Sequence, residues 1–381
     1  MTDLIALLQP RITDRDNLLE FIEDLEDQIP GIERDVAALR RDPSDRALIA
    51  RLFRSLHTIK GDAAICKVEV GVLICHPMES LLARCRDGDI LFNNLIAETI
   101  LLALDRLELT VDALRSGRDV AHLNLPQLVG GMEGMATATP DELAARAATT
   151  IEAVTGFKPL YSNVEVPPAK PAEATTTLAH AEPFASQPLQ GNGQADDLRF
   201  FRELAMQFES RSPLFKGRTD RILRLALDTN AAAGNPVDVA QLEAAVCMHD
   251  VGMMFAPESV WLKVDKLSDD DKRQLQEHPL HGAGLLSRMT RWGAAAEMVR
   301  QHHEMPNGAG YPARLTDSVI STGAKILAIV DAFEAVTLKH SHRGQTRSLV
   351  RAIAEINACD NQFAAELIAP FNSVIRKMVE A

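Results

Sequence analysis

Aromatic residues are scarce in this chain, since Phe, Trp and Tyr make up only 4% of its 381 residues. β-Sandwiches and barrels draw on aromatic and β-branched residues, so this scarcity, beside many Ala and Leu residues, favours helices. Long apolar runs are also missing: no stretch of about 18 or more uninterrupted apolar residues occurs, which argues against a membrane span. The first residues, MTDLIALLQP, lack a basic start followed by an apolar core, so we expect no signal peptide and a cytoplasmic protein.

Paired cysteines and excess positive charge are absent as well. The five cysteines are odd in number and include no CxxC pair, as expected for reduced thiols rather than a disulfide framework or a cysteine zinc site. The formal net charge is −13. A surface of that charge repels nucleic-acid phosphates and anionic lipid, so no DNA, RNA or membrane partner is expected.

Apolar residues recur at three- and four-residue spacing over most of the chain, which is typical of amphipathic helices. Residues 1–121 hold several such segments with breaks at Pro43 and Gly88, and we expect an up-and-down helical bundle there. Residues 122–194 are rich in Pro, Ala, Thr and Gly and predict a flexible linker, with one isolated helix in PDELAARAATTIEAV. Helical patterns return over 195–381. The predicted fold class is all-α, in two domains.

The segment RLFRSLHTIKGDAA carries the first candidate site. On a helix, His57 and Lys60 lie three residues apart on a polar face, and Gly61 leaves room beside the imidazole. A histidine that accepts a phosphoryl group needs an exposed neutral nitrogen and a nearby cation, and this pair supplies both. The same pattern also describes an ordinary surface pair.

HTIKGDAA resembles the HTxKGxA signature of histidine-phosphotransfer domains, and the likeness to those of chemotaxis histidine kinases continues through HPMESLLARCRDGDILFNNLIAETILLALDRL. The resemblance implies that His57 is the phosphate acceptor, assisted by Lys60, and that His76 and Glu79 hydrogen-bond around its ring. It also implies two partners, a separate histidine kinase and the receiver domain of a response regulator.

Six potential metal ligands are distributed over the last 140 or so residues. Imidazoles mixed with carboxylates suit a divalent transition metal, and two such ions can clamp a phosphodiester and activate water. Each residue alone also fits an ordinary surface or core position. The candidates are His249, Asp250, His278, His302, His303 and Asp331.

HDVG, HHEMPNGAGYP and ILAIVDAFEAVT resemble, in order and spacing, the HD-GYP family of phosphodiesterases. The resemblance implies an all-helical HD-type domain that hydrolyses cyclic di-GMP with iron or manganese. It assigns His249, Asp250 and Asp331 to one ion. It assigns His278, His302 and His303 to the other, with Asp250 bridging the two.

The same resemblance implies groups that bind substrate or partners. Lys263 and Arg343 would contact the substrate. Gly310 and Tyr311, in the GYP loop, would bind substrate or a partner protein of the GGDEF type. Several positions depart from the family pattern. Among them, Arg218 stands where the family has an early His ligand, Met253 where it has Lys, and His340 where it has Arg.

These departures leave the ion count at one or two and keep three functions open. The first is a cyclic di-GMP phosphodiesterase controlled by phosphoryl transfer at His57. The second is a phosphotransfer protein whose degenerate second domain only binds nucleotide or partner proteins. The third, a general HD-type nucleotide phosphohydrolase, fits the His249–Asp250 pair but leaves the GYP loop unexplained.

Overall fold

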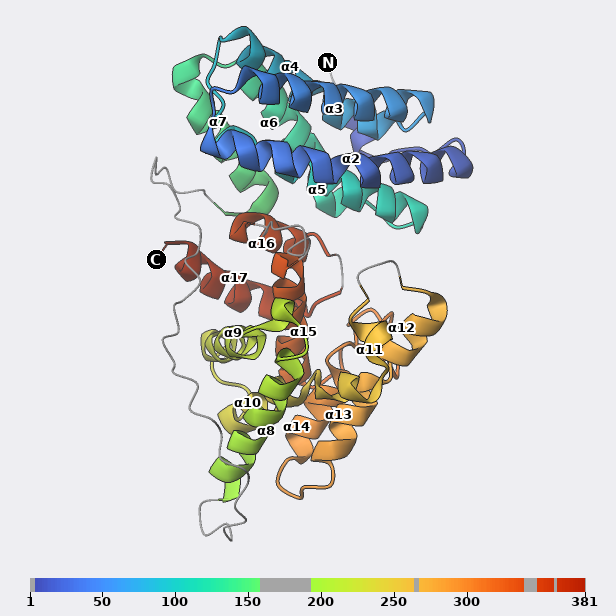
Figure 1. Cartoon of the computed structure of the whole chain (residues 1–381), viewed down its shortest axis with the longest axis vertical. Coiled ribbons are helices and arrows are strands. Elements are labelled where there is room, and N and C mark those ends of the chain that lie inside the picture. The colour runs from blue at the N-terminus through green and yellow to red at the C-terminus, as the bar shows by residue number, and fades with distance from the viewer. Residues whose placement is uncertain (1–3, 158–192, 264–266, 339–347, 360–361, 381) are drawn as a thin grey trace. The chain divides into compact units, whose positions relative to one another are not determined.

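The computed structural model describes residues 4–157, 193–263, 267–338, 348–359 and 362–380 (Figure 1). Its contacts divide the chain into unit 1, residues 1–159 and 347–360, and unit 2, residues 160–346 and 361–381. Over the described ranges, every regular element is helical, and one isolated β-bridge joins Asn307 to Thr316. The all-α fold class is therefore confirmed.

Unit 1 is a helical bundle around one hydrophobic cluster. The breaks expected from the sequence lie at helix ends: the Asp45 carboxylate caps the third helix, and Gly88 ends the fourth with a left-handed φ of 86°. Its elements are α1 (Leu4–Leu8), α2 (Arg15–Arg41), α3 (Arg46–Ile65), α4 (Glu69–Asp87), α5 (Asn94–Arg115), η1 (Ala121–Leu123), α6 (Leu125–Thr137), α7 (Pro140–Thr155) and α16 (Leu349–Asn357).

Within residues 122–194, where a flexible linker with one isolated helix was expected, residues 125–137 instead form a second helix, α6. The helix expected in PDELAARAATTIEAV is present as α7, but it is not isolated, since α6 and α7 pack together in unit 1. The sequence hid this packing because the two helices meet through small residues. A Cβ placed on Gly131 would lie 2.4 Å from Oγ1 of Thr150, so only glycine permits the observed approach. Residues 158–192 lie outside the described part.

Helix α16 also differs from the expected domain boundaries. Residues 195–381 were expected to form one domain, yet residues 347–360 belong to unit 1 by their contacts. Ala354 and Ala358 lie in the same hydrophobic cluster as α2, α5 and α7. The reason is a set of buried polar and apolar contacts between residues about 250 positions apart, which no local pattern reveals.

Unit 2 is built from shorter helices with buried aromatic contacts, such as the edge-to-face pair of Phe201 and Trp292 at 5.3 Å. None of the helices in the described ranges is long and apolar enough to cross a membrane. Its elements are α8 (Gly193–Glu209), η2 (Pro213–Phe215), α9 (Arg218–Ala232), α10 (Val239–Met248), η3 (Val251–Phe255), α11 (Glu258–Trp261), α12 (Asp269–Leu275), α13 (His278–Leu286), α14 (Gly293–Gln301), α15 (Thr322–Leu338) and α17 (Ala365–Glu380).

Two adjacent glycines of α6 test the packing of α6 on α7. Gly131→Ala should destabilise the protein by about 1–3 kcal/mol because its methyl group overlaps Thr150. Gly130→Ala, whose Cβ would meet nothing within 4 Å, should be neutral or stabilise by up to about 1 kcal/mol through helix propensity. Urea unfolding of the full chain measures both, and equal effects of the two substitutions would contradict the packing.

Candidate functional site

His57 lies on α3, with its side chain 67% exposed, and faces Glu79 of α4. Its Nδ1–H donates to Oε1 of Glu79 at 3.0 Å, because a carboxylate can only accept. The Lys60 ammonium contacts the other oxygen of the same, buried carboxylate. This bonding leaves the exposed Nε2 with its lone pair, which is the nitrogen that a phosphoryl donor can reach.

The structure separates the two helpers that the sequence suggested. Glu79 contacts the ring, whereas His76 is exposed on α4 and the structure gives no bond between it and His57. The expected role of His76 therefore stays a prediction. Instead Phe53, one turn before His57, stacks on the imidazole at 6.3 Å, and the Arg86 guanidinium lies over the Phe53 ring at 4.9 Å.

In unit 2, three candidate histidines are oriented in the same way: His249 and His302 directly follow a helix, and His278 lies three residues after the end of α12. The Nδ1–H of His249, His278 and His302 donates at 2.6 Å to the carbonyl oxygen three residues earlier, which belongs to Val246, Leu275 and Val299 respectively. The last carbonyls of a helix have no partner within the helix, so the imidazoles satisfy them. A carbonyl accepts only, and each Nε2 is therefore the nitrogen turned toward the site.

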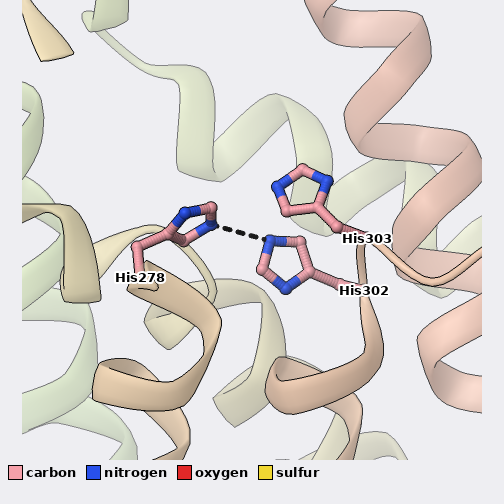
Figure 2. Close-up of side chains that lie close together, drawn as sticks. All are labelled: His278, His302 and His303. Atoms are coloured by element: carbon pink, nitrogen blue, oxygen red, sulfur yellow. Dashed lines mark hydrogen bonds between the residues drawn. The ribbon is translucent and has the colours of Figure 1, made fainter. Parts of the chain in front are cut away.

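His278, His302 and His303 form one possible metal-binding group, with one ring nitrogen of each within 4.8 Å of the others. Figure 2 shows His278, which begins α13, reaching toward the two histidines that follow α14. The Nε2 atoms of His278 and His302 face each other at 3.2 Å. Burial lowers the pKa of His278 and of His303 to about 4, which favours the neutral imidazole that binds metals.

The loop that carries Gly310 and Tyr311 packs against the same group. The Tyr311 ring stacks on His303 at 4.7 Å, and the Tyr311 amide donates to the His303 carbonyl oxygen at 3.1 Å. A Cβ on Gly310 would lie 2.4 Å from the Met305 nitrogen, so only glycine at this position lets the loop pack this closely on the backbone near His303. Both residues thus position His303.

Glu304 anchors this loop and was not identified from the sequence. Its buried carboxylate accepts from the amides of Ala313 at 2.6 Å and Leu315 at 2.8 Å. The only signal available was an acidic residue directly after a histidine pair, which equally describes a surface position.

His249, Asp250 and Asp331 form the second possible metal-binding group, and Arg218 fills it. The guanidinium of Arg218 forms ion pairs with Asp250 and Asp331 and lies 3.3 Å from Nε2 of His249. Burial opposes ionisation of Asp250, but the charges of His249 and Arg218 outweigh it and hold the pKa of that carboxyl well below its usual range. Asp250 also reaches the first group, with Oδ1 3.6 Å from Nε2 of His278.

The backbone at the start of α9 fixes the direction of Arg218. Gly217 adopts a left-handed φ of 70°, and Glu209 accepts from the amides of Gly217 at 2.7 Å and Thr219 at 2.5 Å. The Glu209 carboxylate thereby satisfies the exposed amides of the helix N-terminus. Glu209 is a second residue that the sequence did not identify, because its partners lie beyond a helix break.

The remaining candidates lie apart from these groups or outside the described residues. Lys263 is exposed, and its ammonium contacts Asp271 at 2.7 Å rather than either group. Met253 is half-buried in η3. Arg343 and His340 lie outside the described residues.

Comparison with known proteins adds two family matches. A family model described as an Hpt domain matches residues 16–117, and one described as an HD domain matches residues 203–366. The chain carries both domains. The Hpt domain includes His57 and Glu79, and the HD domain includes both possible metal-binding groups.

Curated relatives match the chain only over short stretches. The cyclic di-GMP phosphodiesterase response regulator RpfG of Xanthomonas campestris is 37% identical over 103 residues, 26% of this chain and 27% of that protein. A cyclic di-GMP phosphodiesterase of Vibrio cholerae is 33% identical over 108 residues, which cover 26% of this chain and 22% of that protein. The 3'3'-cGAMP-specific phosphodiesterase 2 of Vibrio cholerae is 36% identical over 98 residues, which cover 25% of this chain and 19% of that protein. The chain thus spans about a quarter of the length of these relatives or less.

The bond between His57 and Glu79 generates a prediction about phosphoryl transfer. With a chemotaxis-type histidine kinase and ATP, the full chain should gain acid-labile phosphate, and His57→Gln should gain none. Glu79→Gln should be labelled about 10–100-fold more slowly, because the ring loses the carboxylate that orients it. His76→Gln should be labelled at the wild-type rate. Labelling of His57→Gln equal to wild type would remove His57 from this role.

The tight approach at Gly310 generates a second prediction, about the loop. Gly310→Ala should displace the loop from His303 and destabilise the domain by about 1–3 kcal/mol. Gly293→Ala, whose added carbon would meet nothing within 4 Å, is the matched control and should leave stability nearly unchanged. Thermal unfolding of the full chain gives the comparison, and an unaffected Gly310→Ala protein would show that the loop is not held as described.

Proposed function

We propose that the HD domain is a metal-dependent phosphodiesterase acting on cyclic dinucleotides, first of all cyclic di-GMP, and that phosphoryl transfer at His57 regulates it. One observation carries the metal dependence. The Nε2 atoms of His278 and His302 face each other at 3.2 Å while both Nδ1 atoms are committed to carbonyl oxygens. Two neutral imidazoles in this position direct their lone pairs at each other, and a cation bound between them removes that repulsion.

The residues present fit one ion better than two. Three imidazoles, two of them buried and that of His303 half-buried, supply nitrogen donors, and a carboxylate oxygen of Asp250 lies 3.6 Å from His278; this donor set suits iron or manganese. In the other group, Arg218 already neutralises Asp250 and Asp331. A second divalent ion there would have to displace a buried guanidinium that is ion-paired twice, so we propose a single ion.

A bound ion would polarise a phosphoryl oxygen and lower the pKa of a water molecule beside it. The protein's own residues prepare that position. The carbonyls of Leu275 and Val299 orient His278 and His302, and the Tyr311 ring holds His303 in place. Arg218 fixes Asp250 between the two groups through its ion pair.

Arg218 also favours a second candidate function, in which the HD domain binds a nucleotide or partner protein without hydrolysing it. Enzymes that clamp a phosphodiester between two ions use both positions, and here one holds a side chain. Turnover decides between these two functions.

The partners follow from the same proposal. A separate histidine kinase would charge His57 and a receiver domain would accept the phosphoryl group, since the exposed imidazole is open to a docking protein. The GYP loop has exposed residues, Ala313 and Arg314, beyond the buried Gly310, and these would meet a partner of the GGDEF type.

Replacing Arg218 tests the ion count. The wild-type full chain, loaded anaerobically with iron or with manganese, should bind one ion, and Arg218→His should bind two because a neutral ligand replaces a cation. Arg221→His is the matched control: Arg221 lies on the same helix and pairs with Glu334, so this variant should keep one ion. Elemental analysis and isothermal titration give the stoichiometry. Two ions in the wild type would contradict the proposed role of Arg218.

Hydrolysis itself is tested on the metal-loaded full chain with cyclic di-GMP. Linear or fully cleaved product should form, and the variant His302→Ala/His303→Ala should fall to background because it loses two of three imidazole ligands. His281→Ala, an exposed histidine next to Glu277, should retain turnover. Absence of product from wild-type protein with confirmed metal would assign the domain to nucleotide or protein binding instead.

A further inference from the structure

Helix α16 is held in unit 1 by a buried ion pair. Nε and Nη2 of Arg351 each donate at 2.7 Å to one oxygen of Asp105 on α5, and Nη2 lies 3.4 Å from the Glu33 carboxylate on α2. All three side chains are 7% exposed or less. A bidentate contact between a guanidinium and a carboxylate fixes both distance and orientation, so it specifies how α16 packs on the helices of unit 1.

Apolar and backbone contacts surround this ion pair. Ala354 and Ala358 belong to the hydrophobic cluster of unit 1, and Val350 packs against it. At the two ends of the helix, the Ser348 hydroxyl contacts the Glu98 carboxylate at 2.9 Å, and the Asn357 amide donates to the Thr155 carbonyl at 3.4 Å. The helix is therefore seated along its whole length on α5 and α7.

The contact between α16 and the bundle also buries polar atoms that have no hydrogen-bond partner among the described residues. Nη2 of the buried Arg106 guanidinium donates to the carbonyls of Val154 and Ala354, while Nε and Nη1 of the same group have no partner within the described ranges. Oδ1 of Asn357 is buried and likewise has none there. Buried unpaired polar groups oppose association because they lose water. If α16 dissociated from the bundle, water could again bind these groups. The contact is therefore suited to reversible docking rather than permanent burial.

The docked helix leaves the phosphate acceptor accessible. His57 is 67% exposed with α16 in place, and α16 packs on α5 and α7 and reaches α2 through Arg351, whereas His57 and Glu79 lie on α3 and α4. A kinase or receiver domain can therefore reach His57 while α16 is bound.

Helix α16 belongs to one domain by sequence and to the other by its contacts. The HD family model matches residues 203–366, a range that includes α16, and the residues that flank the helix belong to unit 2. By its contacts, however, α16 belongs to unit 1, which carries the Hpt domain. We propose that the surface formed by Glu33, Asp105, Arg106 and α7 is a docking site whose occupant is α16 of the same chain. The Hpt bundle thereby binds a helix that interrupts the HD domain and holds it through Arg351.

Charge reversal with rescue tests this docking site in the full chain. Hydrogen–deuterium exchange should be slow at residues 349–357 in the wild type. Arg351→Glu should accelerate it about tenfold or more, because two buried carboxylates then face a third. The double variant Arg351→Glu/Asp105→Arg should restore slow exchange. Arg34→Glu, an exposed charge reversal next to Glu33, should have no effect on α16.

Exchange at α9 and α10 serves as the folding control in every variant, and Arg351→Met is used if the charge reversal does not fold. Fast exchange of α16 in the wild type, or unchanged exchange in both Arg351 variants, would overturn the docking site. Protection that disappears on dilution, together with a dimer mass, would overturn the assignment to the same chain. Exchange is read without metal or nucleotide, so a failure here is distinct from a failure of the proposed hydrolysis.

Discussion

The hydrogen bonds between helix-terminal carbonyls and imidazole rings determine the geometry of the HD site. A helix leaves its last carbonyl oxygens without partners, and His249 and His302 each follow a helix closely enough to donate Nδ1–H to one of them. His278, three residues after the end of α12, does the same. Each of these bonds fixes the direction of Nε2, so the protein's own backbone orients the three rings toward the site.

The electrostatic balance of the site follows from one side chain. Asp250 and Asp331 are buried carboxylates that need positive charge, and an ion or a guanidinium can provide it. Arg218 provides it permanently, from a helix start that Glu209 fixes. The two neighbouring groups thereby become different in kind. In one group the carboxylates are ion-paired with Arg218, while the other consists of imidazoles whose lowered pKa favours the neutral form.

Sequence patterns predicted what is local in this protein. Helical spacing indicated the all-α fold, and motifs indicated both possible metal-binding groups and the pairing of His57 with a residue on the next helix. These patterns did not predict contacts between residues that lie far apart in the sequence. Arg351 looks like an ordinary helix-surface residue until Asp105, 246 positions away, lies beside it. His76 has the expected spacing from Glu79 but is directed to solvent.

Small residues account for close helix packing that the sequence analysis did not predict. Gly131 lets α6 pack closely on α7, so a segment with few large side chains is ordered where its composition suggested a linker. Gly252 similarly permits η3 to approach the backbone of His278, since a Cβ there would lie 2.0 Å from its carbonyl oxygen. In a sequence, glycine usually indicates a turn or the end of a helix, and only the three-dimensional structure shows that these glycines allow close packing.

If one ion bound by imidazoles and one guanidinium share the HD site, anomalous diffraction from crystals of the manganese-loaded full chain will show it. We expect a single anomalous peak bonded to the Nε2 atoms of His278 and His302 and to the His303 ring, with Arg218 still between Asp250 and Asp331. A peak bonded to Asp331 and His249, with Arg218 displaced, would contradict it.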